Sequence, residues 1–376
     1  MTSRRDGRAA SPGVHGSEVR PVVSREGVDL VRLGSAIVIV GVGVLADAAL
    51  GIAHGALVGG LVAVGYLGVT FGWWRRFWLE PTSAATLTVM RVMIGATVFA
   101  YGLSLSRDVT VLFSEDGLLP SPTYRDGRFG VFQWWEGDGA LWTMYAVLLA
   151  SALAVIAGRG VRIAAPLMWL AVMSFHQDNP SLLNGGDDLL RIWTAYFAVF
   201  AVLTPSRFLS VPLFGCRDEH GVRRWPLAPT WIVRVAQIQL TVIYPATVIA
   251  KLPGETWRNG TASLYALGLQ DFERFWIPDF MRTSVYLGTF MTWFTLAVEI
   301  SLPFLLWTRR TRWIGIVAGL GMHLGFDYTM RVGFFMWSLA IGYASFVKPE
   351  EFERALRRLA RVPARMTPSG RRVART

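Results

Sequence analysis

The sequence predicts an all-α fold, a polytopic integral membrane bundle of about ten transmembrane helices with both termini inside. Of its 376 residues, 53% are hydrophobic and only 17% are charged, and the mean hydropathy is +0.40. Soluble domains carry about 25% charged residues, so this chain has too few to cover a surface in water. Sixteen Trp and 22 Phe residues supply the aromatic side chains that gather at membrane interfaces. A single cysteine, Cys216, excludes an internal disulfide framework. We therefore expect a multi-pass protein of the cell membrane.

The predicted helices follow from apolar runs long enough to cross a hydrocarbon core of ~30 Å. Two of the runs precede residue 75 and eight follow it, and the last two are the shortest. The predicted spans are residues 33–50, 55–73, 84–105, 139–158, 163–178, 188–204, 230–251, 284–307, 313–328 and 332–347.

The positions of the basic residues predict the topology. Of the 37 Lys and Arg residues, 26 fall in the termini and connections that an N-in chain would place inside, 8 fall outside and 3 lie within spans. This asymmetry follows the positive-inside rule. The net charge of +11 is therefore a topology signal, and we expect no nucleic-acid partner.

Composition divides the chain into four parts. Residues 1–30 are rich in Arg, Ser, Gly and Pro and are predicted to be a disordered basic arm. Residues 31–74 hold two extra transmembrane helices, residues 75–350 the main membrane domain, and residues 351–376 a basic cytoplasmic tail. We expect no cleaved signal peptide. An amphipathic helix that begins at Pro349 is predicted to lie on the anionic inner leaflet, and a solvated tail is the alternative.

Three outer connections are long or unusually polar: residues 106–138, 176–188 and 251–282. The inner connections are short and basic, apart from residues 205–229. This difference places a functional site at the outer face or in the outer half of the bilayer.

Lys251 is the first candidate catalytic residue. It ends an apolar run, and Pro253 and Gly254 then stop the helix. An amine at the edge of the hydrocarbon gives up its proton more easily than one in water, and it can then act as a general base, which arginine cannot. The alternative is an interface lysine that snorkels and pairs with Glu255 or a lipid phosphate.

His323 and Asp327 are the other candidate catalytic residues, since a spacing of four places them on one helix face. Three roles fit this spacing: a base with its orienting carboxylate, two metal ligands joined by His176, or a hydrogen-bonded pair between helices. No ligand spacing of a known type supports the metal site, so we predict no metal.

Further charged residues lie within or beside the predicted spans. Glu299 and Arg91 are both intramembrane, and a mutual salt bridge is the simplest expectation, with a proton relay as the alternative. Asp187 and Asp188 precede a helix, where acidic residues complement the helix dipole. With Asn184 they also suggest a polar pocket.

Several of these residues belong to a familiar pattern. The run from Tyr244 to Leu252 and the run WRNGTA at 257–262, with Tyr265, resemble the signature of the HTTM (vitamin K-dependent gamma-carboxylase-like) membrane domain family. The resemblance covers about residues 75–350. Further matching elements are residues 76–91, FSEDGL at 113–118, NGGDDLLR at 184–191, and His323 followed by RVGFF at 331–335.

The resemblance implies a function for the candidate residues. In the carboxylases a lysine at this position is the base thought to deprotonate a reduced quinone, which implies that role for Lys251, assisted by His323 and Asp327. It also implies a reduced quinone as cofactor and a carboxylase-like lyase or oxidoreductase activity. The candidate substrate-binding residues are Asn184, Asp187, Asp188, Trp257 and His176.

One departure from the carboxylases limits this expectation. They bind the propeptide of their substrate with a large extramembrane domain, and this sequence ends about thirty residues after its last predicted span. We therefore do not expect glutamate carboxylation. Short bacterial relatives resemble a membrane protein needed to mature a sporulation-delaying toxin peptide.

Three functions remain open. The first is a membrane enzyme or maturation factor that acts on a quinone or an exported peptide at the outer face. The second is a non-catalytic membrane partner or chaperone of a secreted peptide, of the toxin maturation or immunity type. The third is a transporter, which the lack of paired broken helices disfavours.

Overall fold

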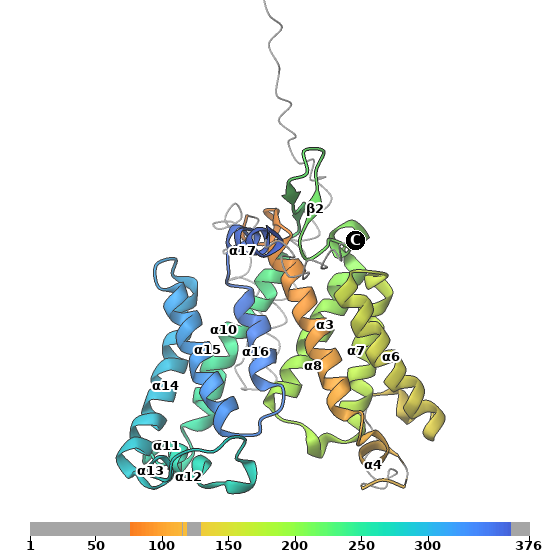
Figure 1. The fold of residues 1–376 in the computed structure, drawn as a ribbon. Helices are drawn as coiled ribbons and strands as arrows, with labels where there is room; N and C mark the ends of the chain where they lie inside the picture. The colour runs from red at the N-terminus through yellow and green to blue at the C-terminus, as the bar shows by residue number, and fades with distance from the viewer. Residues whose placement is uncertain (1–75, 115, 119–128, 362–376) are drawn as a thin grey trace, which may run out of the picture. The chain divides into compact units, whose positions relative to one another are not determined.

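Antiparallel helices run back and forth between two ends of a bundle in this computed structural model, which describes residues 76–114, 116–118 and 129–361 (Figure 1). These described residues from Phe77 onward belong to one unit. Its long helices are α3 (Ala85–Leu105), α6 (Asp138–Ala157), α7 (Val161–Asp178), α8 (Gly185–Leu203), α10 (Trp231–Lys251), α14 (Val285–Trp307), α15 (Arg312–Thr329) and the shorter α16 (Phe335–Ala344).

Each of these helices lies on one of the eight spans predicted after residue 75, so the helical prediction is confirmed there. Four of them, α3, α6, α10 and α14, are long and apolar enough to cross a membrane. Helix α16 is apolar but shorter, with ten residues. The first two predicted spans, the N-terminal arm and the end of the tail lie outside the described residues.

Short elements cover the two ends of the bundle. At one end β1 (Thr82–Ser83) pairs antiparallel with β4 (Leu227–Ala228), and β2 (Cys216–Arg217) pairs antiparallel with β3 (Arg223–Arg224). Helix α9 (Ser206–Leu209) follows α8 at that end. The opposite end carries α4 (Val109–Phe113), η1 (Val131–Gln133), η2 (Pro180–Leu182), α11 (Glu255–Arg258), α12 (Ala262–Gly268), η3 (Gln270–Phe272) and α13 (Asp279–Thr283) (Figure 1).

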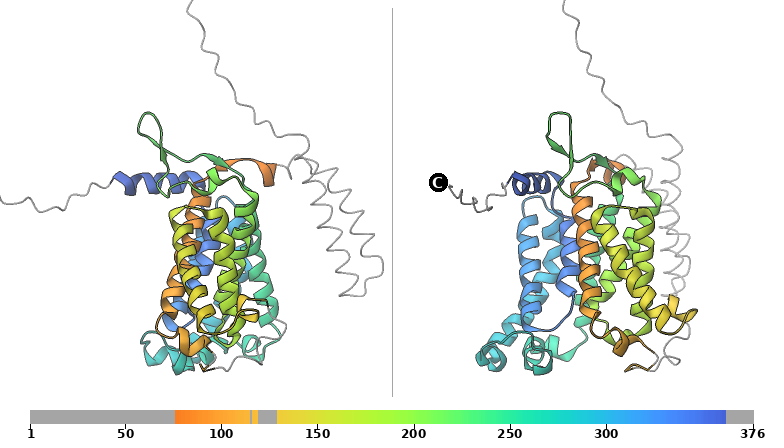
Figure 2. Two further views of the ribbon diagram at one scale, coloured as in Figure 1. Left: turned by 90° about the vertical axis from the view of Figure 1, so that its right-hand side faces the viewer. Right: turned by 45° about the vertical axis from the view of Figure 1, so that its right-hand side comes forward.

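The predicted C-terminal amphipathic helix is present as α17 (Pro349–Arg361), and Figure 2 shows it lying across the end of the bundle. Leu356 is buried, and Glu353 accepts a hydrogen bond from Ser83 at 2.5 Å. Arg357 pairs with Glu353 at 2.8 Å and lies over the ring of Trp225. These contacts hold the helix against the bundle, so this stretch is not a solvated tail.

Large aromatic side chains fill the centre of the bundle, where α8, α10 and α16 meet. Trp193 is almost fully buried and donates its indole proton to the carbonyl of Ser338 at 2.7 Å. The start of α8 comes close to the start of α16, because a Cβ on Gly186 would lie only 2.6 Å from the backbone nitrogen of Phe335. This approach fixes the polar first turn of α8 beside α16.

The predicted salt bridge between Arg91 and Glu299 is wrong. The guanidinium of Arg91 donates to the carbonyls of Val155, Ile156 and Val211, the last two at 2.9 Å. Val155 and Ile156 belong to the last turn of α6, whose carbonyls lack partners within the helix. Arg91 satisfies them with its several donors and needs no carboxylate.

Candidate functional site

Lys251 is the last residue of α10, and its ammonium faces inward across the bundle. Nζ donates to both carboxylate oxygens of Glu299 on α14, at 2.5 and 2.6 Å. The Glu299 side chain is only 4% exposed and that of Lys251 is 23% exposed. The predicted alternative pairing of Lys251 with Glu255 is therefore wrong, since Glu255 instead bonds Asn259.

Trp257 covers the Lys251 amine from the end of the bundle opposite α17. It lies on α11, and Nζ is 5.0 Å from its ring centroid, which is cation–π distance. The turn after Lys251 brings this ring back over the amine, because Gly254 bonds to the carbonyl of Lys251 and α11 starts at once. The amine thus lies between a carboxylate and an aromatic face.

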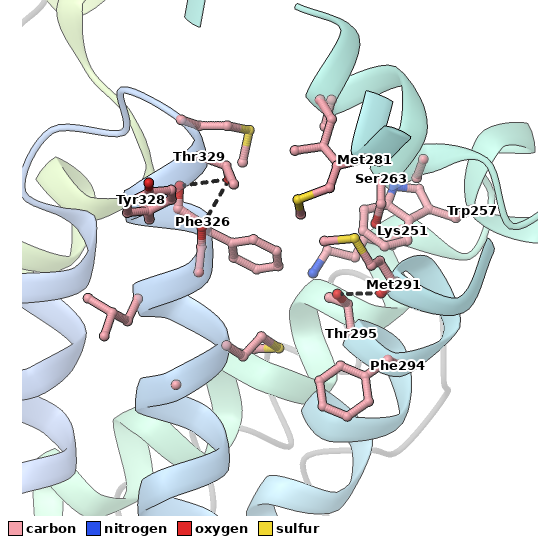
Figure 3. Close-up of a pocket in the computed structure, with 18 residues that line it drawn as sticks. Lys251, Trp257, Ser263, Met281, Met291, Phe294, Thr295, Phe326, Tyr328 and Thr329 are labelled. Carbon is pink, nitrogen blue, oxygen red and sulfur yellow. Dashed lines mark hydrogen bonds between the residues drawn. The ribbon is translucent and has the colours of Figure 1, made fainter. Parts of the chain in front are cut away.

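Two cavities share the Lys251 side chain as part of their walls. The larger has a volume of about 710 Å³ and the smaller about 500 Å³. Phe326 and Met330 also line both. Figure 3 shows the larger cavity, with the Lys251 amine pointing toward Phe326. A ligand in either cavity would meet the same amine.

The larger cavity is almost entirely apolar. It lies between α14 and α15, and α12 and α13 cover its end opposite α17. Met281, Met291 and Met322 line it together with Phe294 and Phe326. Flexible thioethers and aromatic rings suit an apolar ligand of irregular shape.

The smaller cavity collects the polar candidates. Asn184 and Asp188 from α8 line it together with Lys251, Glu299 and His323. The sequence places these residues in two connections and in two separate predicted spans, and the structure brings them to one wall.

His323 is buried on α15 and belongs to a hydrogen-bonded chain of three side chains. Its Nε2 lies 3.1 Å from the hydroxyl of Tyr244, which also bonds the hydroxyl of Tyr343. His323 Nδ1 has no partner in the described residues. Neither tyrosine was predicted as a site residue, although Tyr244 begins the run that resembles the HTTM signature. The spacing could have indicated Tyr244, because it lies seven residues, or two helical turns, before Lys251 and therefore on the same face of α10.

Asp327 does not act on His323. Its carboxylate pairs with Arg274 at 2.6 Å, and its other oxygen has no partner in the part of the chain that the structure describes. Asp327 also lines neither cavity. The predicted hydrogen-bonded pair is therefore wrong, because an arginine from the loop before α13 competes for the carboxylate.

His176 lies away from both cavities. It is fully buried on α7, edge-on to the ring of Tyr101 with 5.4 Å between centroids, and both ring nitrogens lack partners in the described residues. Within those residues no group of three His, Cys, Asp or Glu side chains could hold a metal ion. The suggested site of His176, His323 and Asp327 is not formed.

The turn that starts α8 divides its polar residues between two roles. Asn184 caps the helix by accepting from Gly186 at 2.7 Å, and Asp187 bonds back to the Asn184 backbone at 2.9 Å. This reciprocal capping box accounts for Asp187, which lines neither cavity. Asp188 pairs with Arg191 at 2.5 Å and still faces the smaller cavity.

Comparison with known proteins supports the resemblance drawn from these residues. The model of the HTTM domain matches residues 79–350, most of the chain. The chain belongs to the HTTM domain family. No curated protein and no solved structure matches it. The match includes Lys251, Glu299 and His323, so the site lies wholly inside the HTTM domain.

Proposed function

We propose that this HTTM membrane protein removes a proton from a lipid-soluble reduced quinone, with Lys251 as the general base. The observation that carries the proposal is the position of the Lys251 amine, in the shared wall of two mainly apolar cavities, the smaller of which is also lined by Asn184, Asp188, Glu299 and His323. A quinol combines an apolar body with acidic hydroxyl groups, so it matches apolar walls that carry a few polar side chains. The active face would be the outer one, with both chain termini inside.

The partner of Lys251 makes the base chemistry possible. A lysine and a glutamate that share one proton exist either as an ion pair or as a neutral amine beside a carboxylic acid. Burial in apolar surroundings penalises the ion pair, because each ion loses its hydration. The short distances from Nζ to both carboxylate oxygens allow the proton to pass to Glu299, and in that neutral form the Lys251 amine has a free lone pair. It can then break the O–H bond of the substrate and take up that proton.

His323 and Asn184 would orient the substrate in the smaller cavity. His323 lines that cavity, its buried Nδ1 has no partner in the described residues, and Tyr244 holds the ring through Nε2. Preorganised polar groups of this kind lower the cost of aligning a substrate. Asp327, bound to Arg274, takes no part in this step.

The second candidate function is a non-catalytic membrane partner of a secreted peptide. The observation that favours it is that Asp187, Asp188 and Asp327 each have a structural partner already. If the Lys251–Glu299 pair stays ionised, Lys251 is an anchoring charge and not a base.

The chain offers a direct test, because it contains only two lysines, Lys251 and Lys348. In the Lys348→Arg variant Lys251 is the only lysine, and in the Lys251→Arg variant Lys348 is the only one. Each purified variant is treated with phenyl isothiocyanate, a small apolar reagent that reacts only with neutral amines, from pH 6 to pH 10. Peptide mass spectrometry separates the lysine product from that of the N-terminus.

The base proposal expects Lys251 to react at pH 7 at a rate that levels off with rising pH, and a naphthoquinol to slow the reaction. The variant with Lys348 as its only lysine provides the matched reference, because a lysine in water reacts at a rate that rises about tenfold per pH unit below its solution pKa. A Lys251 rate that rises in the same way shows an ion pair and favours the binding function. No reaction at any pH also contradicts the proposal, since a base closed to a small apolar reagent is closed to substrate.

A further inference from the structure

The segment between α10 and α14 reaches across to α15 and is fixed at both sides. We call residues 262–283 the rim segment. Ser263 donates its backbone proton to the hydroxyl of Thr292 on α14 at 2.9 Å. The backbone of Arg331, just after α15, donates to the carbonyl of Phe272 at 2.7 Å. The rim segment therefore joins the outer ends of α14 and α15.

The inner side of the rim segment forms part of the larger cavity. Ala262, Ser263, Ala266, Leu267 and Met281 all line it. The cavity thus lies directly beneath the rim segment, between α14 and α15.

The rim segment carries large exposed hydrophobic side chains, five of them aromatic. Each is at least 50% exposed, and the set is Tyr265, Leu269, Phe272, Phe275, Trp276 and Phe280. Contiguous apolar surface of this kind marks a binding or membrane surface. Figures 1 and 2 show α12 and α13 at the end of the bundle opposite α17, beneath α14.

Several charged groups of the rim segment are paired with one another or with α15. Arg274 binds Asp327, and Arg282 binds Glu273, both at 2.6 Å. Pairing neutralises these charges and lowers the cost of placing them near hydrocarbon. Asp279 also lies 3.9 Å from the guanidinium of Arg282, but its side chain is 93% exposed.

Exposed apolar side chains also occur at the start of α14. Helix α14 begins two residues after α13 ends, and Tyr286 and Phe290 in its first two turns are strongly exposed. Since α14 is one of the helices apolar enough to cross a membrane, its exposed side faces lipid. Tryptophan and tyrosine concentrate where such a surface meets the headgroups.

We propose that the rim segment lies in the interface of the lipid bilayer, with its aromatic side chains inserted, so that the larger cavity opens to lipid and not to water. The partner of this surface is the membrane itself. Any ligand of the larger cavity would then arrive by lateral diffusion from the acyl chains. This inference is independent of the chemistry of Lys251 and holds for a binding protein as well.

The test uses the single cysteine of the chain. Cys216 is exposed in β2, at the opposite end from the rim segment, and a bimane label on it reports an aqueous position. In the Cys216→Ser background, Phe280→Cys and Trp276→Cys place the label on the outer apolar side, and Asp279→Cys places it on the adjacent charged position. Each protein is reconstituted in nanodiscs, which leave both faces open to solution.

The label at positions 280 and 276 should be quenched at least twofold more by shallow nitroxide-bearing lipids than the label on Cys216. It should be quenched at least threefold less by aqueous iodide, and position 279 should fall between the two. Both positions 280 and 276 are labelled so that the test still holds if one of the two variants does not fold. If labels at 280 and 276 match the Cys216 label with both quenchers, the rim segment faces water and the proposal fails.

Discussion

Removing the ammonium from the Lys251–Glu299 pair should destabilise the protein in a pH-dependent way. The Lys251→Met variant keeps the length of the side chain but leaves the Glu299 carboxylate, which is only 4% exposed, without its cation. Removing one partner of a buried ion pair costs about 3–5 kcal/mol of unfolding free energy. This cost has an upper limit, because Glu299 can take up a proton and become neutral. Holding a glutamic acid neutral at pH 7 costs about 3.7 kcal/mol, since its solution pKa is about 4.3 and each pH unit is worth about 1.36 kcal/mol.

The direction of the pH effect follows from counting protons. In the folded variant Glu299 is protonated, whereas in the unfolded chain it is ionised above about pH 4.3. The folded state then binds more protons, so the free energy of unfolding falls as pH rises. We expect a loss of about 2 kcal/mol at pH 6 and about 4 kcal/mol at pH 7, relative to the wild type.

Unfolding in mixed micelles, monitored by circular dichroism at several pH values, measures these losses. The matched control is the double variant Lys251→Met with Glu299→Gln, which removes the buried carboxylate and should recover most of the stability at pH 7. A Lys251→Met loss that does not change with pH, or a double variant no more stable than the single one, would refute a buried, interdependent pair.

Two further predictions concern the start of α8. The Gly186→Ala variant should lose at least about 2 kcal/mol of unfolding free energy in the same assay, because its Cβ would clash with the backbone of Phe335. The control is Gly185→Ala, whose Cβ would lie 3.4 Å from the ring of Phe335. It should lose less than half as much. Equal losses at the two glycines would contradict the close approach of α8 and α16. The Asn184→Ala variant should lose about 1 kcal/mol of unfolding free energy, because the N-terminal cap of α8 is removed. The Asp188→Ala variant should lose less, because it removes only the exposed ion pair with Arg191. A larger loss for Asp188→Ala than for Asn184→Ala would argue against the capping box.

The positions of the helices were predictable because their signals are local. Apolar runs of spanning length are bounded by polar, Gly or Pro residues, and each of the eight runs after residue 75 carries a helix, although α16 covers only ten residues of the predicted span 332–347. The capping role of the turn before α8 was predictable for the same reason, since Asn184 and Asp187 are three residues apart. Helix α17 was visible from its charge pattern after Pro349.

The partners of the buried charges were not predictable in the same way. Lys251 and Glu299 are 48 residues apart, and their pairing depends on which faces of α10 and α14 meet. Local spacing misled at Asp327, where the helical position one turn from His323 is correct but a cation in a distant loop binds the carboxylate. The chain from His323 through Tyr244 to Tyr343 needs three helices in register, which no sequence pattern specifies.

Helix α17 sets a practical boundary for work on isolated domains. The HTTM match stops at residue 350, but the helix continues to Arg361 and keeps Leu356 buried. A truncation placed at the family boundary would remove the carboxylate that holds Ser83, at the start of the matched region, and would uncover the indole of Trp225. Minimal versions of this protein, and fusions to its C-terminal side, should therefore retain the chain through residue 361.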